Sequence, residues 1–126
     1  MENIRKSIHS VYELHVHIVW STKYRFGVLK GDVRAGCRDL IRKTCDSMDV
    51  RILKEVVSKD HIHLHLSYPP KVSTSDLVKR VKGRSARLLM DEFSELTKRY
   101  WGQHLWGIGY GAWSSGNITD EMIQEY

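Results

Sequence analysis

Three histidines alternate with apolar residues just after Asp60, at positions His61, His63 and His65. Alternate side chains of a β-strand point to the same face, about 6.6 Å apart along the backbone. His61 and His63 can therefore reach one divalent ion while Ile62 packs in the core, because neutral imidazole is a common metal ligand. His65 could replace His61, so His63 belongs to both possible pairs. Taken alone, these residues also fit histidines that face solvent or form hydrogen bonds without a metal.

A second pair, His15 and His17, has the same spacing in an earlier segment. That pair lies in the middle of a predicted strand, with Glu13 as its nearby acidic residue. By contrast, His61 begins its strand directly after a tight turn, where a ligand can reach a cleft at the sheet edge. We therefore favour the later pair. A zinc hydrolase is a weaker interpretation, because the two cysteines lack metal-ligand spacing and the sequence contains no His-Glu-x-x-His helix.

Positive charges are concentrated in one predicted helix and in one loop. Like charges this close on a helix repel one another, and phosphate groups would offset that repulsion. The loop around Tyr24 mixes cations with aromatic rings, as surfaces that bind single strands do. The candidate DNA-binding residues are Lys23, Arg25, Lys79, Arg80, Lys82, Arg84 and Arg87. A solvated helix face without a partner is the alternative interpretation.

Tyr126 is the last residue of the sequence, a position typical of a frayed terminus. It could instead be a nucleophile. The pKa of a tyrosine hydroxyl is ordinarily about 10, so attack on phosphorus at neutral pH needs a metal that polarises the phosphate. The histidine pair could provide that metal.

Hydrophobic periodicity predicts the secondary structure that carries these residues. The expected order is a strand over 11–22, a helix over 32–48 capped by Asp32, strands over 50–58 and 61–68, a helix over 75–95, a glycine-rich strand over 104–114 and a last helix. Ser73, Thr74 or Ser75 can cap the second helix, and Asn117 or Thr119 the last. This order predicts an α+β fold: a ferredoxin-like antiparallel sheet with helices on one face, plus a C-terminal helix carrying Tyr126.

The composition is typical of one globular domain spanning residues 1–126. The hydrophobic content of 41% suffices for one core, and no linker or repeat is visible. The apolar stretch from Val11 to Trp20 is interrupted by charged and histidine side chains, which predicts no membrane association and a soluble, cytoplasmic protein. Cys37 and Cys45 are expected to be reduced core thiols. The net charge of +5 permits a polyanionic partner without requiring one.

Several motifs in one order resemble the single-tyrosine HUH transposases, the TnpA-like enzymes of minimal insertion sequences. The resemblance covers nearly the whole chain. The matching stretches are 14–25 (LHVHIVWSTKYR), 60–64 (DHIHL), 68–71 (YPPK), 77–85 (LVKRVKGRS) and 116–126 (GNITDEMIQEY). Together they are far more specific than any one of them.

The resemblance implies that His61 and His63 are paired ligands of a divalent metal, Mg²⁺ or Mn²⁺, and that Tyr126 is the nucleophile. Such enzymes cleave and rejoin single-stranded DNA at hairpin-marked element ends through a 5′-phosphotyrosine intermediate, and they act as homodimers. The family usually supplies a third ligand one turn after the tyrosine. Either the C-terminal helix is truncated here, as we expect, or the metal completes its shell with water, Glu125 or His65.

Two further functions remain open from the sequence. A domesticated relative with the same chemistry could process chromosomal palindromes instead of moving an element. A ferredoxin-like module could also bind nucleic acid without catalysis, in which case Tyr126 and the histidines would be dispensable for binding.

Overall fold

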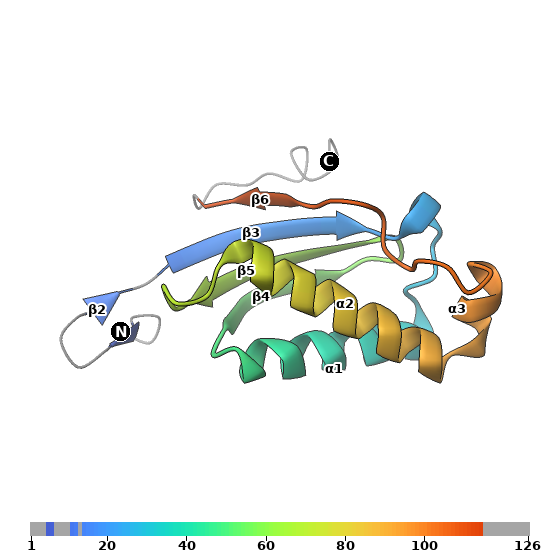
Figure 1. Cartoon of the computed structure of the whole chain (residues 1–126), viewed down its shortest axis with the longest axis horizontal. Helices are drawn as coiled ribbons and strands as arrows, with labels where there is room; N and C mark the ends of the chain where they lie inside the picture. The colour runs from blue at the N-terminus through green and yellow to red at the C-terminus, as the bar shows by residue number, and fades with distance from the viewer. Residues whose placement is uncertain (1–4, 7–10, 13, 115–126) are drawn as a thin grey trace.

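The computed structural model describes residues 5–6, 11–12 and 14–114. Its main sheet is antiparallel, with the strand order β4-β5-β3-β6 (Figure 1). The strands are β3 (Leu14–Ser21), β4 (Arg51–Val57), β5 (His61–Tyr68) and β6 (Gly111–Trp113). Two short strands, β1 (Arg5–Lys6) and β2 (Val11–Tyr12), pair with each other in a separate hairpin.

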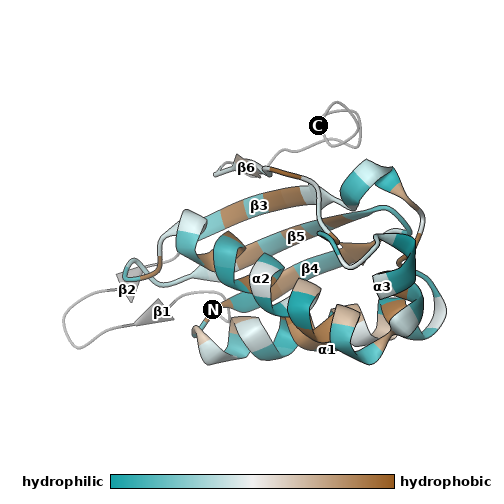
Figure 2. Cartoon of the chain, turned by 45° about the vertical axis from the view of Figure 1, so that its right-hand side comes forward, coloured by the Kyte–Doolittle hydropathy of each residue, from teal (hydrophilic) through white to brown (hydrophobic). Residues whose placement is uncertain are grey.

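Helices α1 (Gly31–Ser47) and α2 (Thr74–Glu92) cover one face of this sheet (Figure 2). A short helix, α3 (Ser94–Arg99), follows α2, and the single turn η1 (Lys23–Arg25) follows β3. The N-terminus of α2 is capped by Ser73, whose hydroxyl oxygen accepts a hydrogen bond from the backbone N–H of Asp76. The predicted α+β class, with an antiparallel sheet and helices on one face, is confirmed.

The core lies between the sheet and the two long helices. Alternate residues from Val16 to Trp20 in β3 and from Ile62 to Leu66 in β5 are buried there, and the inner faces of α1 and α2 complete it. Main contributors are Val16, Ile18, Trp20, Ile62, Leu64, Leu66, Cys37, Ile41, Leu77, Val81 and Leu89. Both cysteines are unpaired thiols, and burial raises the pKa of each to about 12.

Two predicted helix boundaries differ from the structure. The helix expected over 75–95 is interrupted, because Phe93 has an extended backbone that ends α2 and starts α3. At the first helix, Lys30 occupies the N-cap position and Asp32 lies in the first turn. Its carboxylate there still complements the helix dipole.

The strand expected over 104–114 is also shorter than predicted. Only Gly111–Trp113 pairs along β3, while the preceding residues cross the end of β3. The Lys23 N–H donates to the Leu105 carbonyl, and the Gly107 N–H donates to the Ser21 carbonyl. A Cβ at position 107 would meet Ser21 Oγ at 3.2 Å, so glycine allows this close approach. The predicted C-terminal helix lies outside the described residues.

No helix within the described ranges is both long and apolar enough to span a membrane.

Candidate functional site

A row of histidines lies on the sheet face opposite α1 and α2. In the antiparallel register, His61, His63 and His65 of β5 pair with Ser21, Val19 and His17 of β3. Residues 62, 64 and 66 enter the core, so the three β5 histidines share the other face. The predicted convergence of His61 and His63 on one face is therefore present in the backbone register.

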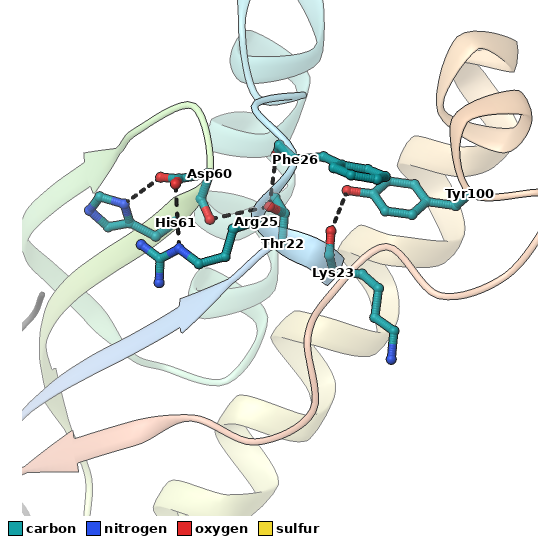
Figure 3. Close-up of polar contacts among 7 residues, drawn as sticks. All are labelled: Thr22, Lys23, Arg25, Phe26, Asp60, His61 and Tyr100. Carbon is teal, nitrogen blue, oxygen red and sulfur yellow. Dashed lines mark hydrogen bonds and ion pairs between the residues drawn. The ribbon is translucent and has the colours of Figure 1, made fainter. Parts of the chain in front are cut away.

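Asp60 anchors the imidazole of His61 (Figure 3). Its Oδ1 lies 2.9 Å from His61 Nδ1, and its Oδ2 lies 3.4 Å from Arg25 Nε. Burial raises the pKa of the Asp60 carboxyl, but hydrogen bonds and charge from His61 and Arg25 lower it more, so the net shift is downward. The resulting carboxylate accepts the Nδ1 proton of His61. That tautomer places the lone pair on Nε2, the arrangement commonly found in metal-ligating histidines.

His63 is more deeply placed and contacts another histidine. Its Nε2 lies 3.1 Å from His17 Nδ1, and the exposed fractions of the two side chains are 7% and 6%. The ring of His17 also stacks on that of His65, with centroids 4.1 Å apart. Burial lowers the pKa of His17 to about 4, and the neighbouring imidazoles of His65, His63 and His15 add to the shift. His17 is therefore neutral near pH 7.

The chemistry of these donors fits a divalent metal. Imidazole nitrogens suit Mn²⁺ and later transition metals better than Mg²⁺, which prefers oxygen. Nε2 of His17 and Nε2 of His65 are buried and have no hydrogen-bond partner in the described part of the chain. This face therefore has ring nitrogens that are not engaged in hydrogen bonds. Within residues 5–6, 11–12 and 14–114, however, no three His, Cys, Asp or Glu side chains are arranged to hold one ion.

Most of the predicted DNA-binding cations line a groove in the helical layer, which we call the α2 groove. It has a volume of about 740 Å³ and lies between the end of α1, at residues 47–49, and the outer side of α2. Its basic residues are Lys71, Lys79, Arg80, Arg84 and Arg87. Asp49 and Asp76 also line it. The α2 groove and the histidine row thus occupy different layers of the molecule.

Lys82 does not line the α2 groove with the other basic residues of α2. Its ammonium donates to the carbonyl oxygens of Gly107 and Gly109, each 2.9 Å away. One turn along α2, Ser85 Oγ lies 3.0 Å from Trp106 Nε1, which also donates to the Lys82 carbonyl. Burial lowers the pKa of Lys82 below its ordinary value. The structure thus places the Lys82 side chain against the segment that leads to β6, not in the α2 groove.

The other two predicted cations are the first and last residues of the turn η1. The Arg25 side chain points toward Asp60, whereas Lys23 extends in a different direction (Figure 3). Lys23 Nζ instead lies 5.3 Å from the ring centroid of Tyr24. Tyr126, the predicted nucleophile, lies outside the described residues.

The sequence does not reveal that Asp60 and His17 contact the histidine pair. Asp60 appears there only as part of a turn and a motif. His17 appears only as a mid-strand residue, although antiparallel pairing of two strands with alternating histidines would place both sets on one face.

Comparison with known proteins identifies the family. A family model for IS200-like transposases matches residues 10–126. The chain is 35% identical over 116 residues to the ISDra2 transposase TnpA of Deinococcus radiodurans, covering 92% of this chain and 83% of that protein. It is also 35% identical over 118 residues to the transposase for insertion sequence element IS200 of Salmonella typhimurium, covering 94% and 77%.

Solved structures agree with this result. A crystal structure of a Deinococcus radiodurans protein described as a transposase superposes with a TM-score of 0.89 at 34% identity, covering 97% of this chain and 94% of that one. A REP-associated tyrosine transposase bound to a REP hairpin has a TM-score of 0.61 at 16% identity, covering 92% and 66%, and shares the fold. The chain belongs to the IS200-like transposase family and is a DNA-processing enzyme.

Proposed function

We propose that this protein cleaves and rejoins single-stranded DNA at hairpin-marked element ends, with Tyr126 as nucleophile and a divalent metal held by His61 and His63. The polar contacts of His61 and His63 support this function. Asp60 orients His61, and His17 contacts His63, so both members of the pair have a partner that can fix the imidazole plane. Such partners are typical of metal-ligating histidines.

A bound divalent ion would polarise the scissile phosphate and offset its developing charge. The Tyr126 oxygen would attack phosphorus, forming a phosphorus–tyrosine bond while the bond to the 3′ oxygen breaks. The leaving oxygen takes up a proton and becomes a 3′-hydroxyl. Rejoining is the reverse reaction with the 3′-hydroxyl of the incoming strand, so the phosphodiester energy is conserved and no nucleotide is hydrolysed.

The α2 groove is the proposed binding surface for the hairpin. Lys79, Arg80 and Arg84 line it, and their charges suit the phosphates of a duplex stem. The histidine row lies on the other face of the sheet, so hairpin binding and cleavage would use different surfaces. We also propose that the active form is a homodimer, because enzymes of the family that the sequence resembles act in pairs.

A cleavage assay tests the proposal. The substrate is a labelled single-stranded oligonucleotide carrying the hairpin from the gene's own flank. We expect cleavage with Mn²⁺ or Mg²⁺, none with chelator, and none for His63→Ala in either metal. An exposed histidine outside the row gives the control His104→Ala, which should cleave normally. Full activity of His63→Ala would remove the metal from this strand. Hairpin binding without any cleavage by the native chain would favour the non-catalytic binding module.

A further inference from the structure

The turn after β3 holds two residues in an uncommon backbone conformation. Tyr24 and Arg25 have φ angles of 59° and 53°, in the left-handed region that non-glycine residues seldom adopt. Such conformations persist where the surrounding structure fixes them, and they occur often at binding sites. The contacts around Tyr24 and Arg25 therefore indicate whether this turn forms a binding site.

Hydrogen bonds from both sides fix the turn (Figure 3). The buried Thr22 hydroxyl donates to the Phe26 carbonyl at 2.8 Å, and the Tyr100 hydroxyl donates to the Lys23 carbonyl at 3.2 Å. These bonds engage the backbone and leave the Tyr24 side chain directed outward. Its exposed fraction is 64%, which is high for a tyrosine beside a packed core.

The Tyr24 ring is supported from within the protein. The centroids of the Tyr24 and Phe26 rings lie 5.4 Å apart. The Arg99 guanidinium carbon in turn lies 3.9 Å from the Phe26 ring centroid. Lys23 Nζ lies near the Tyr24 ring as well. An exposed aromatic ring with a cation beside it has the chemistry of a base-stacking surface in proteins that bind single strands.

Arg25 connects this ring to the histidine row. Its Nε contacts Asp60, whose other carboxylate oxygen contacts His61. The Arg25 side chain remains 48% exposed, and a guanidinium has five N–H donors, so it can contact a phosphate while it keeps the Asp60 contact. The turn is therefore continuous with the candidate metal centre.

We propose that Tyr24 and Arg25 form a nucleotide subsite for single-stranded DNA beside the metal centre, in which Tyr24 stacks on a base and Arg25 contacts the adjacent phosphate. The identity of the ligand rests on the proposed function. Stacking is tolerant of sequence because every base has a π-face, so the subsite positions the strand without selecting one base.

Binding of hairpin-free DNA without metal tests the stacking contact. The probe is an oligothymidylate containing one 2-aminopurine, whose fluorescence is quenched by stacking. We expect Tyr24→Ala to raise the Kd about tenfold and abolish quenching, while Tyr24→Phe stays within about twofold of the native chain. Leu14→Ala, which shortens a partly exposed side chain at the other end of β3, should have no effect.

The salt dependence of the same binding tests Arg25. Arg25→Gln should reduce the magnitude of the slope of log K against log salt by about one, because one phosphate contact is lost. Arg38→Gln is a matched control, since Arg38 makes a similar ion pair with Glu55 on the helical side and is 45% exposed. Its slope should not change.

The outcomes separate this proposal from the proposed function. Native quenching and affinity in Tyr24→Ala, or an unchanged slope in Arg25→Gln, would overturn the subsite even if the protein cleaves DNA. Loss of binding in Tyr24→Ala supports the subsite even if the native chain forms no covalent adduct. Equal loss in Leu14→Ala would contradict a local contact at Tyr24.

Discussion

His17 and His63 are 46 positions apart in the sequence, yet their ring nitrogens Nδ1 and Nε2 lie 3.1 Å apart. The contact joins β3 to β5 on the sheet face opposite the helices. His61 has a similar polar contact, with the carboxylate of Asp60. Each histidine of the proposed metal pair thus has its own polar partner.

We predict that His17→Phe weakens Mn²⁺ binding about tenfold to a hundredfold, the usual effect of removing a partner of a metal ligand. Phenylalanine can keep the ring stack on His65 and removes a buried nitrogen that lacks a hydrogen bond, so the fold should persist. Titration followed by electron paramagnetic resonance measures the free Mn²⁺. His104→Ala is the control. Native Mn²⁺ affinity in a folded His17→Phe protein would show that His17 does not orient His63.

Lys82 is predicted to stabilise the fold. Lys82→Met loses two hydrogen bonds from a charged donor to the carbonyls of Gly107 and Gly109, which should lower the free energy of unfolding by about 2 kcal/mol. Urea denaturation measures this change. Lys79→Met, three residues away in the α2 groove, should change stability little. Equal stabilities for the two variants would mean that the Lys82 contacts contribute nothing.

Hairpin binding should depend on the α2 groove. Lys79→Met and Arg84→Ala should each weaken binding and reduce the magnitude of the salt slope by about one. Arg42→Ala removes an exposed cation of α1 that contacts Asp39, and it serves as the charge control. Fluorescence anisotropy with a labelled hairpin gives both quantities. If Lys79→Met and Arg84→Ala show the same salt slope as the control Arg42→Ala, the α2 groove does not hold the phosphates.

The two buried thiols should make stability fall at alkaline pH. Burial raises the pKa of Cys37 and of Cys45 from 9.0 to about 12, so the unfolded chain releases these protons first. The thiol contribution is fully present below pH 9 and is lost as pH rises from about 9 to 12. The double variant Cys37→Ala, Cys45→Ala should therefore lose less stability over this window in urea denaturation. A native-like decline in that variant would contradict the shift.

Local patterns predicted the elements with strong periodicity. The alternation over 61–68 matches β5, and the spacing of Val33, Cys37 and Ile41 matches the buried face of α1. The break at Phe93 and the shortened β6 were missed because tertiary contacts decide them. The segment from Leu105 to Gly109 is held by the end of β3 and by Lys82, and no local propensity encodes those partners.

In the candidate site, too, local patterns could be predicted and tertiary contacts could not. Spacing alone placed His61 and His63 on one face, since a strand has a fixed period. The contacts from Asp60 and His17, and the separation of Lys82 from its neighbours on α2, depend on register and on a distant loop. A helical pattern of cations could not show which of them faces solvent.

Mapping the covalent bond between protein and DNA tests directly whether Tyr126 is the nucleophile. The native chain is incubated with Mn²⁺ and hairpin-bearing single-stranded DNA, separated under denaturing conditions, digested and analysed by mass spectrometry. We predict a metal-dependent adduct in which a 5′ phosphate is attached to Tyr126, and no adduct in Tyr126→Phe, which should still bind the hairpin. A phosphotyrosine at another residue, or an adduct that persists in Tyr126→Phe, would show that Tyr126 is not the nucleophile.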